Sequence, residues 1–263
     1  MKVTFADYGS EIASSRLRCQ IPQRELENRG IDKGNDVLIY GKHLLSESDT
    51  RHFSKLVFDI CDDHFGNSQL REYYLHNAAN ADAVTCNSIV MQERIKVETG
   101  RDAIVVREPY EHDQMEADIG PFLLWFGHAS NMIDLDRLAP ELRHPLMVLS
   151  NHPDYDNWSQ EAQDEAMSSQ CIVVIPTGKS MATSENRMVE SIRCGRFVCA
   201  EPLPSYMQFD CFFPIGNIPQ NVELALSNPA DSLARIRAAQ GYIRHKYSPA
   251  TIADEWIEVL KWL

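Results

Sequence analysis

The segment from Pro176 to Arg187 gathers the side chains best suited to hold an anion. Its cationic, hydroxyl and amide side chains lie close together in the sequence: Lys179, Ser180, Thr183, Ser184, Asn186 and Arg187. A helix that starts at the end of this segment would add its unpaired backbone N–H groups, worth roughly 0.3–1 kcal/mol toward an anion. Because that contribution is small, tight binding would require cations, which Lys179 and Arg187 supply. The segment therefore predicts a phosphate site; the alternative is that these are solvated surface charges.

The elements on either side place this segment at one end of a parallel sheet. An apolar, β-branched run, Cys171–Ile175, predicts a strand, and a second strand is expected at Arg196–Ala200. Between them we expect a helix with Ser184 as its N-cap and Gly195 just past its C-terminus, while Glu190 falls outside its apolar face. Strand, loop, helix and strand form the unit of a parallel α/β sheet, in which ligands bind beyond the carboxyl ends of the strands.

The residues of this unit resemble the donor-binding segment of GT-B glycosyltransferases, especially the family-4-like group (glycosyl transferases group 1). The resemblance rests on Lys179, Asn186-Arg187, Glu190 and Gly195-Arg196-Phe197-Val198. It implies that Lys179 and Arg187 contact the diphosphate of a nucleotide-sugar donor, with Ser184 and Asn186 nearby. It also implies that Glu190 binds the ribose hydroxyls. Relatives often carry a further glutamate eight positions before the ribose glutamate, where this chain has Ala182.

A second loop that resembles the donor site of this family follows the apolar run Pro121–Phe126. The run resembles the first strand of the C-terminal domain, and the resemblance implies that backbone near Gly127 approaches the donor diphosphate. Glycine suits such an approach because it has no side chain. His128 could hydrogen-bond to a phosphate or a sugar, or it could be a solvated loop residue. No cationic side chain follows closely, so Lys179 and Arg187 would carry most of the positive charge.

Candidate acid and base groups follow the predicted strand Lys55–Ile60. Asp62 and His64 lie just past its carboxyl end, where they could orient or deprotonate an acceptor; a well-placed general base is worth about 10²–10⁴ in rate. Histidine has a suitable intrinsic pKa, near 6.5. The equally open alternative is that these residues cap a helix that begins near Ser68. We expect no metal, because no second Cys/His pair complements the Cys61–His64 segment.

The first strand-to-helix loop, after the predicted strand Lys2–Ala6, resembles the acceptor-side loop of the same glycosyltransferases. It combines Gly9, Ser10 and Arg16, and it opens a helix whose apolar positions are interrupted by Pro22. The resemblance implies that Gly9, Ser10 and Arg16 lie on the acceptor side of the active site. The alternative is an ordinary connecting loop.

The remaining apolar runs and periodic segments extend the alternation of strands and helices along the whole chain. Further strands are expected at Asp36–Tyr40, Ala83–Cys86, Ala103–Val106 and Leu146–Ser150, and helices at Gln69–Asn80, Ser88–Glu98, Asn157–Ser168, Ser232–Tyr247 and Ser248–Leu263. The pattern predicts an α/β chain with two Rossmann-like domains that face a cleft, as in GT-B proteins. We expect a shortened N-terminal acceptor domain, 1–112, and a C-terminal donor domain, 113–263, whose last helix crosses back to the first.

The composition argues against several other classes of protein. The chain has 263 residues and a net charge of −13 at pH 7, which disfavours a broad basic surface for nucleic acid. Its seven cysteines include no CxxC spacing, which indicates reduced thiols rather than a disulfide framework. No apolar run approaches the ~18 residues of a membrane span, and no signal-peptide core is visible. We therefore expect a cytoplasmic protein without a transmembrane segment.

Together, the residues and the resemblance predict a glycosyltransferase. It would move a sugar from a nucleotide-diphosphate sugar to a hydroxyl of a carbohydrate, lipid-linked or other acceptor. The resemblance implies retention at the anomeric carbon and a reaction without a metal or other cofactor. Lys179 and Arg187 would stabilise charge on the leaving diphosphate. Two alternatives remain open: a nucleotide-sugar isomerase or epimerase with the same architecture, and a nucleotide-sugar-binding or scaffold protein that has lost catalysis.

Overall fold

The chain folds into two compact units. The computed structural model describes residues 1–9, 12–42, 45–176 and 181–263, the side chain of Glu47 excepted. Unit 1 comprises residues 1–111, 182–184 and 246–263, and unit 2 comprises residues 112–181 and 185–245. Each unit contains a five-stranded sheet in which every pair of neighbouring strands is parallel. The predicted architecture of two parallel α/β halves is therefore confirmed.

The sheet of unit 1 keeps its strands in chain order. They are β1 (Val3–Phe5), β2 (Val37–Tyr40), β3 (Lys55–Ile60), β4 (Ala83–Cys86) and β5 (Ile104–Val105). They form where the sequence has short runs of valine, isoleucine, leucine and phenylalanine, as expected for strands that are covered on both faces. Since chain order and strand order coincide, this sheet has no point at which the order reverses.

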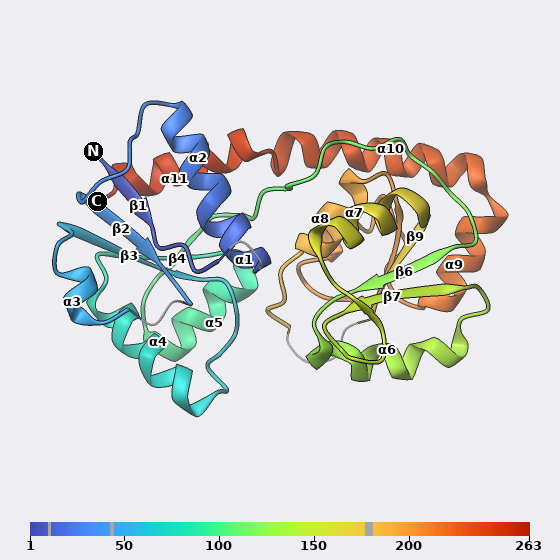
Figure 1. Ribbon diagram of the computed structural model, residues 1–263, viewed down its shortest axis with the longest axis horizontal. Helices are drawn as coiled ribbons and strands as arrows, with labels where there is room; N and C mark the ends of the chain where they lie inside the picture. Colours follow the sequence, from blue (N-terminus) through green and yellow to red (C-terminus); the bar gives the residue numbers. More distant parts are fainter. Residues whose placement is uncertain (10–11, 43–44, 177–180) are drawn as a thin grey trace. The chain divides into compact units, whose positions relative to one another are not determined.

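Helices cover both faces of this sheet (Figure 1). They are α1 (Ala13–Ser15), the π-helical turn η1 (Arg16–Gln20), α2 (Ile21–Asn28), α3 (Glu47–Thr50), α4 (Ser68–Asn80), α5 (Ile89–Thr99) and α11 (Pro249–Lys261). α2 and α11 pack on one face, where the rings of Phe5 and Trp256 meet edge to face with their centroids 5.1 Å apart. α4 and α5 cover the other face, where Tyr74 packs against Phe58.

The first long helix runs through Pro22, as the sequence predicted. The π-helical turn η1 precedes the proline, and the N–H of Ile21 bonds to the carbonyl of Arg16, five residues back. In a regular α-helix, proline lacks the N–H donor and its ring clashes with the carbonyl four residues earlier. A wider turn at this point relieves the clash, so the helix continues to Asn28.

The sheet of unit 2 reverses its strand order in the middle. Its strands are β6 (Leu123–Phe126), β7 (Leu146–Ser150), β8 (Asp156–Asn157), β9 (Ile172–Ile175) and β10 (Phe197–Ala200), in the order β10-β9-β6-β7-β8. The chain builds outward from β6 through β7 to β8 and then returns to place β9 on the other side of β6. The neighbouring strands β6 and β9 therefore form the switch point of this sheet.

Several helical segments of unit 2 depart from the predictions. The helical segments of this unit are η2 (Ala129–Asn131), α6 (Met132–Leu138), η3 (Ala139–Glu141), α7 (Gln160–Ser169), α8 (Asn186–Arg193), η4 (Met207–Phe209), α9 (Ile218–Ser227) and α10 (Pro229–Lys246). The helix expected from Asn157 begins at Gln160, because Ser159 caps it and Asn157 pairs in the edge strand β8. α6 and α9 lie in segments for which no helix was expected.

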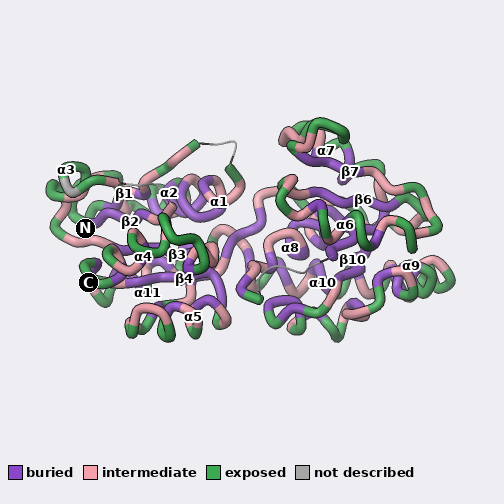
Figure 2. The backbone as a smooth tube through the Cα atoms, turned by 90° about the horizontal axis from the view of Figure 1, so that it is seen from below, coloured by how far each residue is buried: buried purple, intermediate pink, exposed green. Residues whose placement is uncertain are grey.

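Burial follows these layers (Figure 2). Strands β2, β6, β9 and β10 are buried along their whole length. Six of the seven cysteines are buried and none forms a disulfide, in line with the expected reduced thiols. Residues 106–122, between the two sheets in sequence, form neither a helix nor a strand. Within the described residues, no helix is both long enough and apolar enough to cross a membrane.

Candidate functional site

The switch point of unit 2 brings two predicted loops together. In open α/β sheets, ligands bind beyond the carboxyl ends of the strands, where the strand order reverses. The loop after β6 contains Gly127 and His128, and the loop after β9 leads into α8. Because β6 and β9 are neighbours, both loops start from the same edge of the sheet. Lys179, predicted to contact the diphosphate, lies outside the described residues.

Arg187, in the first turn of α8, lies against the backbone of Gly127. A side chain added at Gly127 would place its Cβ 3.5 Å from Nη1 of Arg187 and 3.1 Å from the ring of Trp125. The Gly127 N–H donates to the carbonyl of Leu149, which fixes the loop to β7. The absence of a side chain at residue 127 thus lets the guanidinium approach the main chain. The structure brings these two predicted residues together, and they present a positive charge beside half-buried backbone.

Tyr206 supports Arg187 from the interior of unit 2. Burial raises the pKa of its hydroxyl, and the positive charge of Arg187 opposes that rise. The tyrosine is fully buried, so packing fixes its ring beside the guanidinium. By contrast, His128 is exposed, and its Nδ1 accepts a hydrogen bond from the backbone N–H of Ser130, 3.2 Å away. His128 therefore caps the turn η2 at the edge of the site.

The prediction that Ser184 caps the helix after β9 is wrong. α8 begins at Asn186, its N-cap residue is Glu185, and the Glu185 side chain makes no capping hydrogen bond. Residues 182–184 pack with unit 1 instead. There the Ser184 hydroxyl hydrogen-bonds to the carboxyl group of Glu108. Because that hydroxyl faces unit 1, it is not available to cap α8.

Ala182 is buried in the apolar cluster of unit 1 that also contains Phe58 and Tyr74. At this position, relatives in the resembling family often carry a glutamate. A carboxylate placed among these side chains would lose its hydration without a compensating partner, which costs several kcal/mol. The small apolar residue therefore fits the packing of this loop, and the contacts of the absent carboxylate are not made.

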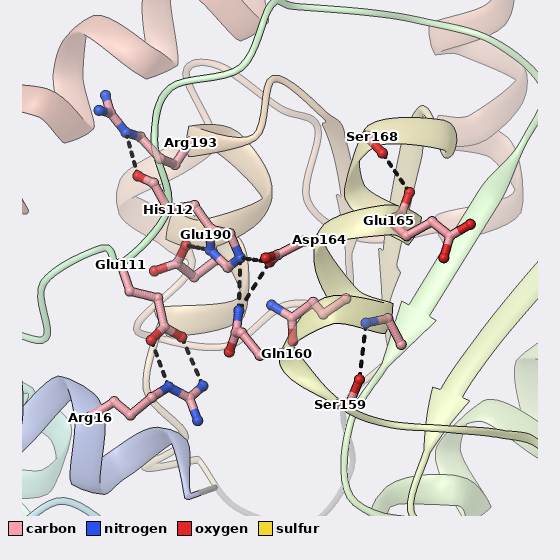
Figure 3. A network of polar contacts seen from close by, with 12 residues as sticks. Arg16, Glu111, His112, Ser159, Gln160, Asp164, Glu165, Ser168, Glu190 and Arg193 are labelled. Atoms are coloured by element: carbon pink, nitrogen blue, oxygen red, sulfur yellow. Dashed lines mark hydrogen bonds and ion pairs between the residues drawn. The ribbon is translucent and has the colours of Figure 1, made fainter. Parts of the chain in front are cut away.

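Glu190 is buried, although the helical pattern predicted that it would lie outside the inward face (Figure 3). Its Oε2 lies 2.6 Å from Nδ1 of His112, and Nε2 of the same ring lies 2.7 Å from Oδ1 of Asp164 in α7. Burial lowers the pKa of His112, but the hydrogen bonds and charges of Glu190 and Asp164 outweigh it and raise the pKa to about 9. At neutral pH, His112 is therefore an imidazolium ion between two carboxylates.

His112, Glu190 and Cys194 could be read as a metal site, since their ligand atoms lie within 4.8 Å of one another. A metal would require a thiolate and a neutral imidazole. However, burial raises the pKa of the Cys194 thiol far above neutrality, and each ring nitrogen of His112 faces a carboxylate. These three side chains fit an ion pair with a neutral thiol beside it better than a metal centre.

In unit 1, the candidate base Asp62 forms an ion pair with Lys42, which follows β2. His64 packs edge-on against Tyr74, with the ring centroids 5.8 Å apart. The alternative reading, that these residues cap the next helix, is wrong, because Asn67 caps α4 by accepting bonds from the N–H groups of its first turn. The structure thus places Asp62 at the carboxyl edge of the sheet with a cation beside it.

The predicted acceptor-side residues lie in the first loop of unit 1. Gly9 has a φ of 118°, which favours glycine, and its N–H donates to Asp7. Arg16 makes two hydrogen bonds to Glu111, of 2.7 and 2.9 Å. Ser10 lies outside the described residues. Arg16 therefore holds the carboxylate that directly precedes His112.

Sequence reasoning missed the charged groups that the fold buries. Arg18 in η1 pairs with Asp59 in β3, and their side chains are only 2% and 7% exposed. Glu108 is also buried, which raises the pKa of its carboxyl group. The available signal was a lone aspartate inside the apolar run of β3. His112 gave no comparable signal, because it stands in a polar segment without periodicity.

No protein-family model matches this chain, and no curated protein sequence is significantly similar to it. Solved structures are similar in fold. HepE from Anabaena, crystallised in complex with UDP-glucose, is similar with a TM-score of 0.69 at 15% identity over 100% of both chains. TarM from S. aureus, in a complex that contains UDP, gives a TM-score of 0.63 at 14% identity over 84% of this chain and 54% of that one.

A third similar structure is AviGT4, a glycosyltransferase involved in avilamycin A biosynthesis. It gives a TM-score of 0.54 at 14% identity over 91% of this chain and 77% of that one. At such low identities, the likeness shows the fold alone. The chain has the GT-B fold, as the sequence predicted, and HepE shares this fold over the full length of both chains.

Proposed function

We propose that this protein is a glycosyltransferase that moves a sugar from a nucleotide-diphosphate sugar to a hydroxyl acceptor, with retention at the anomeric carbon. The observation that carries the proposal is the contact of Arg187 with Gly127 at the switch point of unit 2. Glu190 lies one turn further along the same helix. The crystal structure of HepE, which has the same fold over its whole length, contains UDP-glucose.

In this proposal, the donor binds to unit 2. Arg187 and Lys179 neutralise the diphosphate, and the backbone near Gly127 and the side chains of Asn186 and His128 supply further polar contacts. Ser184, which the sequence also placed here, is excluded from this set because its hydroxyl bonds to Glu108 in unit 1. These cations stabilise the charge that develops on the leaving diphosphate, which is the largest electrostatic contribution such a site can make. Glu190 accepts hydrogen bonds from the ribose hydroxyls. The reaction needs no metal, because the side chains supply the positive charge.

The acceptor binds to unit 1 in this proposal. Asp62 lies at the carboxyl edge of the first sheet, and its ion pair with Lys42 fixes its position. Asp62 or His64 orients the acceptor hydroxyl or removes its proton, and Gly9, Ser10 and Arg16 line the same side. The acceptor is a carbohydrate, a lipid-linked sugar or another hydroxyl compound, and the reaction takes place in the cytoplasm.

The proposal is tested with a panel of UDP-, GDP- and ADP-sugars. Binding is measured by calorimetry for the wild type, for Arg187→Ala and for Arg71→Ala. Arg71 is a matched control, since it is an exposed arginine in unit 1 that pairs with Glu98. A hydrogen bond to a charged group is worth about 1.5–3 kcal/mol, so Arg187→Ala should weaken binding about 10- to 100-fold. Arg71→Ala should bind like the wild type.

Product analysis with the tightest donor decides the type of reaction. Sugar on a new hydroxyl group supports transfer, and its anomeric configuration reports retention or inversion. An epimerised donor would indicate an isomerase, and tight binding without turnover across a broad acceptor panel would indicate a binding protein. If no nucleotide sugar binds, or if Arg187→Ala binds as well as the wild type, the donor-site assignment is wrong.

A further inference from the structure

The imidazole of His112 joins two helices of unit 2 through two carboxylates. Glu190 belongs to α8 and Asp164 to α7, and each lies within 2.7 Å of a ring nitrogen. The side chains of His112 and Glu190 are 7% and 6% exposed, whereas that of Asp164 is 50% exposed. Each nitrogen faces an acceptor, so the geometry is satisfied when both nitrogens carry protons. The ring is then a cation that donates to both carboxylates.

The main chain of His112 is fixed to the same helix. Its carbonyl accepts a hydrogen bond of 3.1 Å from Nε of Arg193, in the last turn of α8. Arg193 also donates to Gln114, two residues further along. His112 is therefore attached to α8 at its carbonyl and at its ring, although its segment contains no helix or strand. Its ring has little freedom to turn away from Glu190.

We propose that His112 is the positioning residue of the donor site: its imidazolium orients the Glu190 carboxylate for the ribose hydroxyls, so that nucleotide binding requires protonated His112. This inference rests on the proposed function, since it takes Glu190 as the group that receives the ribose. It goes further by naming the residue on which Glu190 depends and the condition under which the site is competent.

Glu190 is a buried carboxylate. A charged carboxylate in the protein interior is stable only when it is paired and hydrogen-bonded. His112 supplies both an opposite charge and one hydrogen bond. An ionised carboxylate accepts hydrogen bonds at both oxygens and donates none, which is what a pair of hydroxyl donors requires.

The groups around His112 define what its loss of charge would do. The titratable or charged groups facing it are Glu190, Arg193 and Cys194 of α8 and Asp164 of α7. Gln160 of α7 also contacts Nε2, at 3.0 Å. Once His112 is neutral, it can donate to only one of the two carboxylates. The other carboxylate then faces a lone pair, and the alignment of Glu190 is lost. The raised pKa of His112, about 9, places this change above neutral pH.

The test measures the dissociation constant of a nucleoside diphosphate between pH 7 and 10. The probe is whichever of UDP, GDP and ADP binds tightest to the wild type at pH 7; the phosphate groups, with a second pKa of about 6, are largely ionised across the range. The variants are His112→Gln, whose amide N–H₂ can donate but carries no titrating charge, and Asp164→Asn, which keeps His112 but removes one carboxylate. Any other group that titrates in this range affects all three proteins alike.

The expected result has three parts. Wild-type binding weakens above about pH 9, approaching tenfold per pH unit. His112→Gln binds at least tenfold more weakly at pH 7, and its affinity does not show this additional fall. Asp164→Asn binds nearly as well as the wild type at pH 7, but the fall begins at lower pH, because His112 has lost one of its two stabilising carboxylates. A purely structural role for His112 would not move the inflection in this way.

Two results separate this inference from the proposed function. If a nucleoside diphosphate binds and His112→Gln has the affinity and pH profile of the wild type, His112 does not position Glu190. The inference is then wrong, and the proposed function stands. If none of UDP, GDP and ADP binds the wild type at any pH, the proposed function is wrong, and the inference that rests on it is wrong as well. The dispersion of the amide and methyl resonances in the proton NMR spectrum of the free protein verifies that each variant retains its fold.

Discussion

The buried ion pair of unit 1 gives the sharpest test of how this fold is held together. Arg18 donates to Asp59 through Nε at 2.9 Å and through Nη2, and Nη1 donates to the carbonyl of Arg107 at 3.1 Å. Asp59 also accepts a hydrogen bond of 2.7 Å from Thr85. The guanidinium thus connects the first helix, the middle of the sheet and the segment that leaves β5. We predict that Asp59→Asn severely destabilises the protein.

The magnitude follows from burial. Asparagine has nearly the same shape, but it removes the counter-charge that is hydrogen-bonded to the guanidinium of Arg18, which is 2% exposed, and turns an amide N–H₂ toward its donors. Removing one partner of a buried pair costs about 3–5 kcal/mol, whereas replacing both partners with apolar residues of similar volume is often nearly neutral. With a urea m-value of about 2 kcal/mol/M, a loss of 4 kcal/mol lowers the midpoint by about 2 M. The double variant Arg18→Met with Asp59→Leu should recover much of this loss.

Urea unfolding followed by circular dichroism measures these differences. Arg71→Ala serves as the control, since its pair with Glu98 is partly exposed and exposed pairs contribute about 0–1 kcal/mol. The reasoning is refuted if Asp59→Asn unfolds at the wild-type midpoint. It is also refuted if the double variant is as unstable as the sum of the two single variants, because the two residues would then be uncoupled.

Two further predictions concern unit 2. Because the pKa of His112 is raised to about 9 in the folded protein, its ion pairs stabilise the fold fully below the unfolded-state pKa of about 6.5, and that contribution is lost as the pH rises through 9. The upper bound of this contribution is about 3 kcal/mol, since Asp164 is half exposed and screened. Between pH 6 and 10, the urea midpoint should fall more in the wild type than in His112→Gln. An equal fall of the midpoint in both proteins would contradict the raised pKa of His112. Gly195→Ala should cost at least about 2 kcal/mol, because a Cβ at its φ of 73° would lie 2.2 Å from the carbonyl oxygen of Glu116. Gly30→Ala, at a φ of 79° with no atom within 4 Å of the added Cβ, is the matched control and should cost about 1 kcal/mol; equal costs would show that the contact with Glu116 has no effect.

The strands were predictable because the sequence of a buried parallel strand is a continuous apolar run. The predicted bounds of Lys55–Ile60, Ala83–Cys86 and Leu146–Ser150 are those of β3, β4 and β7. The edge strand β8 was missed, because Asp156 and Asn157 are exposed polar residues that pair only through their backbone. A pattern of side chains carries no information about such a strand.

The donor loops were predictable for the same reason, since they follow predicted strands. The partners of Glu190 were not, because His112 lies 78 residues away in the chain and Asp164 lies 52 residues from His112. A carboxylate on a helix is normally assigned to solvent when no partner is known. The helical pattern therefore placed Glu190 outside, and only the fold reveals the cation that allows its burial.

The interleaving of the two units along the chain has a consequence for biosynthesis. α11 supplies Ile252, Trp256 and Val259 to the apolar cluster that covers one face of the first sheet. During translation, residues 1–111 emerge first, yet the part of this face that α11 covers stays open until some 150 more residues have been added, roughly 8 to 30 seconds at 5–20 residues per second. Unit 2 has all of its segments before then. The half that is synthesised first is therefore the half that completes its folding last, and the part of its sheet left open beside α2 is the surface that a chaperone on the ribosome would meet.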